Sequence, residues 1–161
     1  MSGVSYEGSA LLAALMVCAC AHQPAQTQFQ VDRGAERSTS KGGADEFTGE
    51  VRVQMLMAPN GVRDFSAAYV TFEPGARTAW HSHPAGQTLV VTEGAGWVQL
   101  EGSERVEIHP GDVVWTPPGV RHWHGGTRES AMTHMAVQQQ VEGGVVEWFE
   151  HVDDETYVGG K

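Results

Sequence analysis

Two histidine-bearing segments of the chain carry side chains of the types and spacing that bind metals. They are Gly75-x5-His81-x-His83-x3-Gln87-x6-Gly94 and Gly111-x5-Pro117-x-Gly119-x2-His122. Residues at i and i+2 of an extended strand point to the same face, so His81 and His83 should present their imidazoles together. His122 follows a Pro-Pro-Gly turn at the start of another apolar, aromatic segment. Three neutral imidazoles and one amide oxygen predict a divalent-metal site.

Short apolar segments separated by turn signals must position these side chains. The turn signals include Pro59-Asn-Gly61 and Pro117-Pro-Gly119. Many short strands separated by such turns are typical of an all-β sandwich or barrel, and the jelly roll is a natural candidate. The expected strands are Glu50–Met57, Ala67–Glu73, Thr88–Thr92, Gly96–Glu101, Glu104–Ile108, Asp112–Thr116, His122–Gly125, Met132–Gln138 and Val145–His151.

Length and charge limit the classes of protein that the chain can be. Its 161 residues hold one domain of ordinary size plus a tail. A net charge of −10 argues against nucleic-acid binding, because a phosphate-binding surface needs clustered Lys and Arg. We expect a flexible polar linker at 21–43, a single barrel domain at 44–153 with order beginning near Phe47, and a C-terminal tail at 154–161. A final helical turn outside the barrel is expected at Asp153–Tyr157.

The first 20 residues resemble a lipoprotein signal segment. Ala10–Val17 is an apolar run with the length of a signal-peptide core, and it is too short to span a bilayer. Val17-Cys18-Ala19-Cys20 resembles a bacterial lipobox, in which Cys20 would carry the lipid anchor. The stretch before the core has no Lys or Arg and contains Glu7, so a plain N-terminal extension stays open. A true leader places the protein in the periplasm or anchored at the outer membrane, and otherwise it is cytoplasmic.

The two histidine segments resemble the two sequence motifs of the cupin superfamily. The first cupin motif is G-x5-H-x-H-x3,4-E-x6-G, and the chain departs from it in having Gln87 where Glu is usual. The second is G-x5-P-x-G-x2-H-x3-N, and Gly126 replaces its final Asn. The resemblance covers roughly residues 47–151. It implies a single-domain, all-β, double-stranded β-helix, which is the jelly-roll barrel of cupins.

Gln87 stands in the cupin ligand register, which favours its binding the metal. A Gln amide leaves a divalent site with a charge of +2, whereas a carboxylate would lower that charge to +1. In the alternative, Gln87 only hydrogen-bonds nearby and the metal has three protein ligands. Mixed nitrogen and oxygen ligands suit Mn²⁺, Fe²⁺, Zn²⁺, Ni²⁺ or Co²⁺.

Two further histidines should face the same cavity as the ligands. His124 lies two residues after His122, and alternation in 132–138 puts His134, Ala136 and Gln138 on one face. Inward imidazoles are costly in an apolar barrel interior unless they have a function. The alternative for each histidine is a structural or exposed role, and we assign His109, His151 and His22 to no site.

The five tryptophans divide by strand parity. Trp80 and Trp123 adjoin ligands but have the opposite parity, so they should pack on the outer face of a strand or between subunits. Trp97, Trp115 and Trp148 are expected in the core. The alternative for one of these three is an aromatic wall of a substrate pocket.

The amino-acid sequences of four segments resemble those of small bacterial cupins with (R)-selective hydroxynitrile lyase activity. These segments are residues 72–94, 109–115, 122–125 and 131–138. The resemblance implies a manganese site made by His81, His83, Gln87 and His122. It also implies that His134 is the general base and that Thr78, His124 and Gln138 are its partners in the pocket. The implied substrate is a cyanohydrin, or an aldehyde plus cyanide in reverse, and we expect a homo-oligomer, dimer or tetramer.

Two other functions stay open at this point. A metal-dependent dioxygenase would use open metal positions for oxygen in alkene or C–C cleavage, although the usual carboxylate ligand is missing. A non-catalytic cupin that binds a metal or a small molecule would be expected to lack an inward base, and His134 counts against it.

Overall fold

The computed structural model of the chain describes residues 29–142 and 144–159. The predicted signal segment, the Cys20 anchor, His22 and the first part of the predicted linker lie outside these residues. Within them, no helix is long and apolar enough to cross a membrane.

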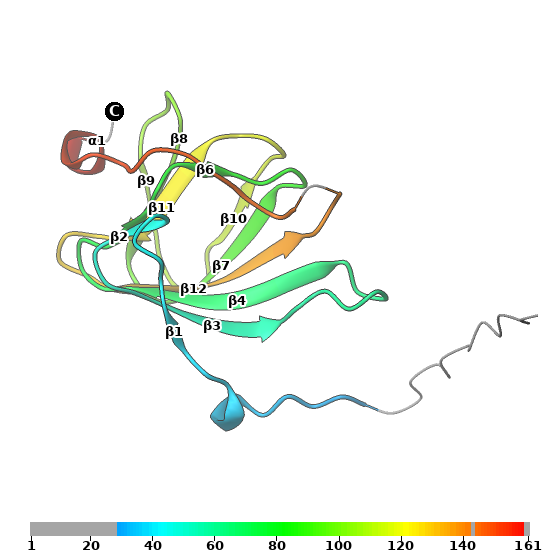
Figure 1. Cartoon of the computed structure of the whole chain (residues 1–161). Helices are drawn as coiled ribbons and strands as arrows, with labels where there is room; N and C mark the ends of the chain where they lie inside the picture. Colours follow the sequence, from blue (N-terminus) through cyan, green and yellow to red (C-terminus); the bar gives the residue numbers. More distant parts are fainter. Residues whose placement is uncertain (1–28, 143, 160–161) are drawn as a thin grey trace, which may run out of the picture. The chain divides into compact units, whose positions relative to one another are not determined.

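From Asp32 onward, the described chain forms one compact unit built from two antiparallel sheets (Figure 1). The six-stranded sheet has the order β1 (Ser40–Lys41), β3 (Val51–Met57), β4 (Phe65–Phe72), β12 (Met132–Gln139), β7 (Gln87–Gly94) and β10 (Val113–Thr116). The seven-stranded sheet has the order β13 (Glu147–Trp148), β6 (His81–Ser82), β11 (His122–Gly126), β5 (Arg77–Thr78) and β2 (Phe47–Thr48), with β8 (Gly96–Leu100) between β11 and β9 (Val106–Ile108). One 3₁₀ turn, η1 (Gly34–Glu36), and one helix, α1 (Asp154–Gly159), complete the described elements. The predicted all-β, jelly-roll class is confirmed.

The space between the sheets is divided into an apolar core and a polar end. β12 lies between β4 and β7, and its burial alternates over residues 132–137, as expected for a strand with one face inward. Phe72, Leu89, Val91 and Met132 are almost fully buried among the inward side chains of these strands. Imidazoles occupy the other end, so the strands that form the core also hold the histidines in place.

The short strands are the part of the fold that the sequence did not predict. All nine expected strands are present with shifted ends, but Val145–His151 pairs only at Glu147–Trp148. β1, β2, β5 and β6 were not expected, because segments of two residues are too short for apolar alternation to show. β6 begins at His81 and β5 ends at Thr78, so these short strands matter for the site.

Residues 40–47, which we call the strap, cross from one sheet to the other (Figure 1). At one end Ser40 is paired with Val53 of β3, and at the other Phe47 is paired with Thr78 of β5. The Gly42 N–H donates to the carbonyl of Val51 at 2.8 Å. Pairing therefore begins at Ser40, earlier than expected, within a segment that sequence reasoning assigned to the linker and the barrel start.

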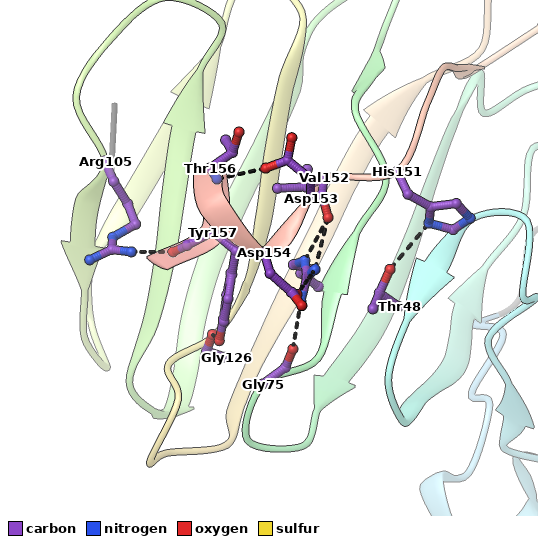
Figure 2. Close-up of polar contacts among 11 residues, drawn as sticks. Thr48, Gly75, Arg105, Gly126, His151, Val152, Asp153, Asp154, Thr156 and Tyr157 are labelled. Atoms are coloured by element: carbon purple, nitrogen blue, oxygen red, sulfur yellow. Dashed lines mark hydrogen bonds and ion pairs between the residues drawn. The ribbon is translucent and has the colours of Figure 1, made fainter. Parts of the chain in front are cut away.

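The C-terminal segment is fastened to the outer face of the seven-stranded sheet (Figure 2). The buried Arg77 guanidinium donates to the Val152 carbonyl from Nε at 3.0 Å and from Nη2 at 2.8 Å, and Nη2 also reaches Asp154 at 2.7 Å. The Tyr157 hydroxyl donates to the Gly126 carbonyl at 2.8 Å, and Arg105 bonds the Tyr157 carbonyl. This segment contains the helix α1, in agreement with the helical turn expected at the start of the tail. It supports β5 and β11 from behind.

The structure places some of the tryptophan side chains differently from the sequence prediction. Trp80 and Trp123 lie on the outer face as parity predicts, but they are buried with Trp97 and Tyr157 beneath the C-terminal segment. Trp115 was expected in the core, and this was wrong. It is 58% exposed, because it points outward from β10, the edge strand of its sheet.

Candidate metal centre

Three histidines from two neighbouring strands converge at the polar end of the barrel. His81 begins β6, His83 follows it by two residues, and His122 begins β11 directly opposite His81 in the antiparallel pair. Their ligand atoms all lie within 4.8 Å of one another, and all three residues are buried. The i, i+2 spacing and the Pro-Pro-Gly turn thus bring together the three imidazoles that the sequence singled out.

Each of these imidazoles is held by a backbone carbonyl near its Nδ1. The carbonyls belong to Ala79 for His81 at 3.0 Å, Val145 for His83 at 2.6 Å and Val120 for His122 at 3.1 Å. A carbonyl accepts only, so it selects the tautomer with the proton on Nδ1 and leaves the lone pair of Nε2 toward the cluster. Metal-binding histidines are commonly fixed in this way.

The contact between His122 and Gln87 also indicates a cation site. His122 Nε2 lies 3.0 Å from Gln87 Oε1, while its Nδ1 faces a carbonyl oxygen. A neutral imidazole has one N–H, so in either tautomer one of the two contacts brings two lone pairs together. A bound cation that accepts both lone pairs would relieve this repulsion. His83 Nε2, buried without a hydrogen-bond partner, has the same need, so these residues fit a metal ion.

The electrostatic state of the cluster favours metal binding at neutral pH. Burial, the largest cause, lowers the pKa of His122 to about 4. Burial and the neighbouring His122 hold the pKa of His81 well below its ordinary value, and burial also lowers the pKa of His83. Neutral imidazoles are the ligand form, so protons compete weakly with a metal here.

Another pair of histidines lies next to this cluster. His134 Nε2 is 3.1 Å from His124 Nδ1, and the remaining nitrogens, His134 Nδ1 and His124 Nε2, are buried without protein partners. The Thr78 hydroxyl accepts a hydrogen bond from the backbone N–H of His124 at 3.2 Å. Phe72 packs against both rings, with centroids 5.6 Å from each. Buried nitrogens without partners cost free energy, so the pair is suited to bind a ligand.

Burial changes the proton affinity expected of His134. An ordinary histidine pKa of 6.5 would make it a base near neutral pH, but burial lowers its pKa to about 3. The pKa is low because the strand parity that aims His134 inward also removes it from water. His134 is consequently neutral, with a free lone pair, throughout the range in which an enzyme works.

Acid should destabilise the metal-free protein as the pH falls from about 7 toward 4. Histidines with a lowered pKa bind fewer protons when folded than when unfolded, so stability is full above the unfolded value of 6.5 and is lost as the pH falls. Each such histidine contributes a slope of up to about 1.4 kcal/mol per pH unit between its two pKa values. Melting temperatures of chelator-treated protein from pH 4.5 to 7.5 test this. His134→Gln should flatten the slope, and a constant melting temperature would contradict the prediction.

A cavity of about 260 Å³ opens onto these histidines. As strand parity predicts, His134, Ala136 and Gln138 of β12 all line it. The Gln87 amide nitrogen donates to Gln138 Oε1 at 3.2 Å, which turns Gln87 Oε1 toward His122. The cavity thus contacts every residue that the sequence assigned to the site except His122, which lies behind its wall.

The sequence did not identify the residues that cover the cavity. Residues 40–43 of the strap line it together with Phe47, and so does Trp148, whose ring contacts that of Phe47. Trp148 therefore fits the alternative of an aromatic wall rather than a core position. Gly42 and Gly43, followed by the aromatic Phe47, could have indicated a segment that covers the cavity. The polar composition around them led instead to the prediction of a linker.

Gly126 stands where the second motif has Asn, and the reason for this replacement is steric. A Cβ atom there would lie 2.8 Å from the Ser130 carbonyl oxygen and 3.0 Å from that of Glu73. The backbone around β11 is too close for any side chain at this position. The Gly126 carbonyl instead receives the Tyr157 hydroxyl.

Comparison with known proteins agrees with this architecture. The sequence profile of the Cupin domain family matches residues 68–137, the region that holds both histidine segments. The chain is also 53% identical over 129 residues to an (R)-mandelonitrile lyase from Granulicella tundricola, covering 80% of this chain and 98% of that enzyme. The chain is a cupin.

Solved structures also match this chain. A cupin-like protein from Thermotoga maritima is 45% identical, with a TM-score of 0.74, and the match covers 81% of this chain and 98% of that one. A predicted oxalate decarboxylase from the same organism shares the fold alone, at 23% identity and a TM-score of 0.60, covering 67% of this chain and 96% of its own. The resemblance seen in the two motifs is confirmed.

Proposed function

We propose that this cupin is a metal-dependent hydroxynitrile lyase that cleaves cyanohydrins of the mandelonitrile type into an aldehyde and hydrogen cyanide, and joins them in reverse. The observation that carries the proposal is the 53% identity to (R)-mandelonitrile lyase over nearly the whole of that enzyme. The buried site supports it, because it combines three imidazoles for a metal with a neutral buried base.

His81, His83 and His122 would hold the metal through Nε2, with Gln87 Oε1 as the fourth ligand. When bound, a divalent ion supplies Lewis-acid stabilisation of the negative charge that develops as the C–C bond breaks. The neutral ligand set keeps the full +2 charge available for this purpose. Among the cavity-lining residues described, the acidic and basic side chains other than histidine are Lys41 and Glu46 of the strap.

His134 is the general base in this scheme. With its Nε2–H donating to His124 Nδ1, its Nδ1 is free to accept the proton of the substrate hydroxyl. The C–C electron pair leaves with the cyanide carbon, and the hydroxyl oxygen becomes the aldehyde oxygen. His134 then returns the proton to cyanide, so the products are the aldehyde and hydrogen cyanide. Its low pKa favours this return.

Mandelonitrile cleavage with oxygen uptake recorded in the same cell tests the function. The proposal predicts benzaldehyde release without oxygen consumption. A protein that consumes oxygen and leaves mandelonitrile intact would instead be a dioxygenase.

Replacing Gln87 by Glu should keep the metal but weaken cyanohydrin cleavage. The added negative charge would lower the site from +2 to +1 and reduce charge stabilisation in the transition state. We expect kcat to fall roughly tenfold, equivalent to about 1.4 kcal/mol. Metal content and steady-state kinetics are compared with Gln140→Glu, an exposed control outside the cavity. If both variants keep parental kinetics, Gln87 does not act on the ion.

Three finer proposals accompany the function. The ion is Mn²⁺, with Fe²⁺, Zn²⁺, Ni²⁺ or Co²⁺ as alternatives that the donor set also accepts, and metal analysis of protein purified without chelators decides between them. The protein is a homo-oligomer, dimer or tetramer, which light scattering tests. Export with a lipid on Cys20 is tested by fractionation and mass spectrometry of the protein from its own host.

A further inference from the structure

The cavity has two chemically different ends. Imidazoles and amides occupy the end next to the metal cluster. Apolar side chains line the other walls, and they come from the six-stranded sheet and from the segment before β13. They are Val53, Met55, Ala68, Val70, Ala136 and Val146. A cavity of this polarity fits a ligand with one polar carbon centre and an apolar substituent.

Trp148 lies at the junction of these two ends. It is paired with His81 across β13 and β6, and its ring centroid lies 4.8 Å from the His81 imidazole with an interplanar angle of 38°. The Phe47 ring meets it edge-on, with centroids 5.8 Å apart. Trp148 is only half-buried and lines the cavity, so part of its surface is available to a ligand next to the metal cluster.

The strap fixes this aromatic pair from the other side. The Phe47 N–H donates to the Gly43 carbonyl at 3.0 Å, and the Ala79 N–H donates to the Glu46 carbonyl at 2.7 Å. A Cβ atom at Gly42 would lie 2.7 Å from the Phe47 ring, so the strap backbone rests directly against that ring. The strap backbone thus packs against Phe47, and Phe47 packs against Trp148.

We propose that Trp148 and Phe47, closed in by the strap, form an aromatic subsite that receives the aryl group of the substrate and makes this enzyme select aryl over small alkyl cyanohydrins. The inference rests on the proposed lyase function and adds a specificity-determining residue to it. Aromatic rings attract one another in offset or edge-to-face arrangements beyond the effect of apolar burial. The volume is also sufficient, because an engineered apolar cavity of about 150 Å³ in another protein binds benzene.

The test compares Trp148→Leu with Trp115→Leu, a matched change at an exposed tryptophan outside the cavity. Cleavage of mandelonitrile and of lactonitrile, its methyl counterpart, is measured on metal-loaded full-length protein. Trp148→Leu should lower kcat/KM for mandelonitrile about tenfold, change lactonitrile less than twofold and retain metal. Trp148→Phe should restore most of the preference, and Trp115→Leu should change neither substrate. An equal loss for both substrates, or a loss for neither, overturns the subsite.

A second readout separates this inference from the lyase function itself. Benzyl alcohol, an aryl probe that does not react, is followed by saturation-transfer NMR with propanol as the alkyl control. Benzyl alcohol should give a signal with the parent protein and with Trp115→Leu, and lose it with Trp148→Leu. If the parent cleaves neither nitrile while this pattern holds, the lyase function fails and the subsite stands. Retention of the benzyl alcohol signal in Trp148→Leu overturns the subsite.

Discussion

Replacing His83 by alanine should remove the metal and cyanohydrin cleavage together. His83 Nδ1 is tied to the Val145 carbonyl at 2.6 Å, and its Nε2 is buried among the other two imidazoles without a partner of its own. Loss of groups that merely orient metal ligands already costs 10–100-fold in affinity or activity, so loss of a ligand should cost more than about 100-fold.

Metal content per chain after dialysis and the initial cleavage rate are measured on one preparation of the His83→Ala protein. His109→Ala provides the matched control, because His109 is exposed and its imidazole lies on the surface beside Glu107. The control should keep both metal and rate. Normal metal content in His83→Ala would contradict the assignment of the metal site to the three histidines.

His134→Ala should behave in the opposite way and separate metal binding from catalysis. His134 is fully buried and bonded to His124, and it is not a member of the three-histidine cluster, so the metal should remain. A positioned base contributes typically 10²–10⁴-fold, or about 3–5 kcal/mol of barrier. We therefore expect the mandelonitrile cleavage rate to fall by that factor at unchanged metal content.

A second variant, His134→Gln, separates loss of the base from loss of packing. Glutamine fills more of the space beside Phe72 than alanine does, but it supplies no imidazole. Both variants should be equally slow if the imidazole matters as a base. A rate within a few-fold of the parent in either variant, with metal present, would make His134 a structural histidine.

The metal cluster was predictable because its geometry is local. The i, i+2 spacing of His81 and His83 needs only an extended backbone to bring both imidazoles to one face. The position of His122 depends on one turn and one antiparallel pairing. The inward direction of the β12 side chains was predictable for the same reason, because a strand of eight residues is long enough for its alternation to be recognised in the sequence.

The cover of the cavity was not predictable, because it depends on contacts between distant segments. The strap has neither apolar alternation nor length, and its place is set by pairing with β3 and β5. Trp115 and Trp148 look alike in sequence, yet the edge position of β10 exposes one and the pairing of β13 with His81 turns the other to the cavity. The lowered pKa of His134 likewise follows from burial, which only the assembled barrel determines.

Titration of metal-stripped protein with Mn²⁺, with mandelonitrile cleavage measured at each addition, tests whether cyanohydrin cleavage depends on the metal. We expect no cleavage above background without metal. We also expect a linear rise that ends at one ion per chain, and no rise at all in His83→Ala. Cleavage that persists at full rate in the stripped protein, or a metal-saturated protein that leaves mandelonitrile intact, would contradict a metal-dependent cyanohydrin lyase.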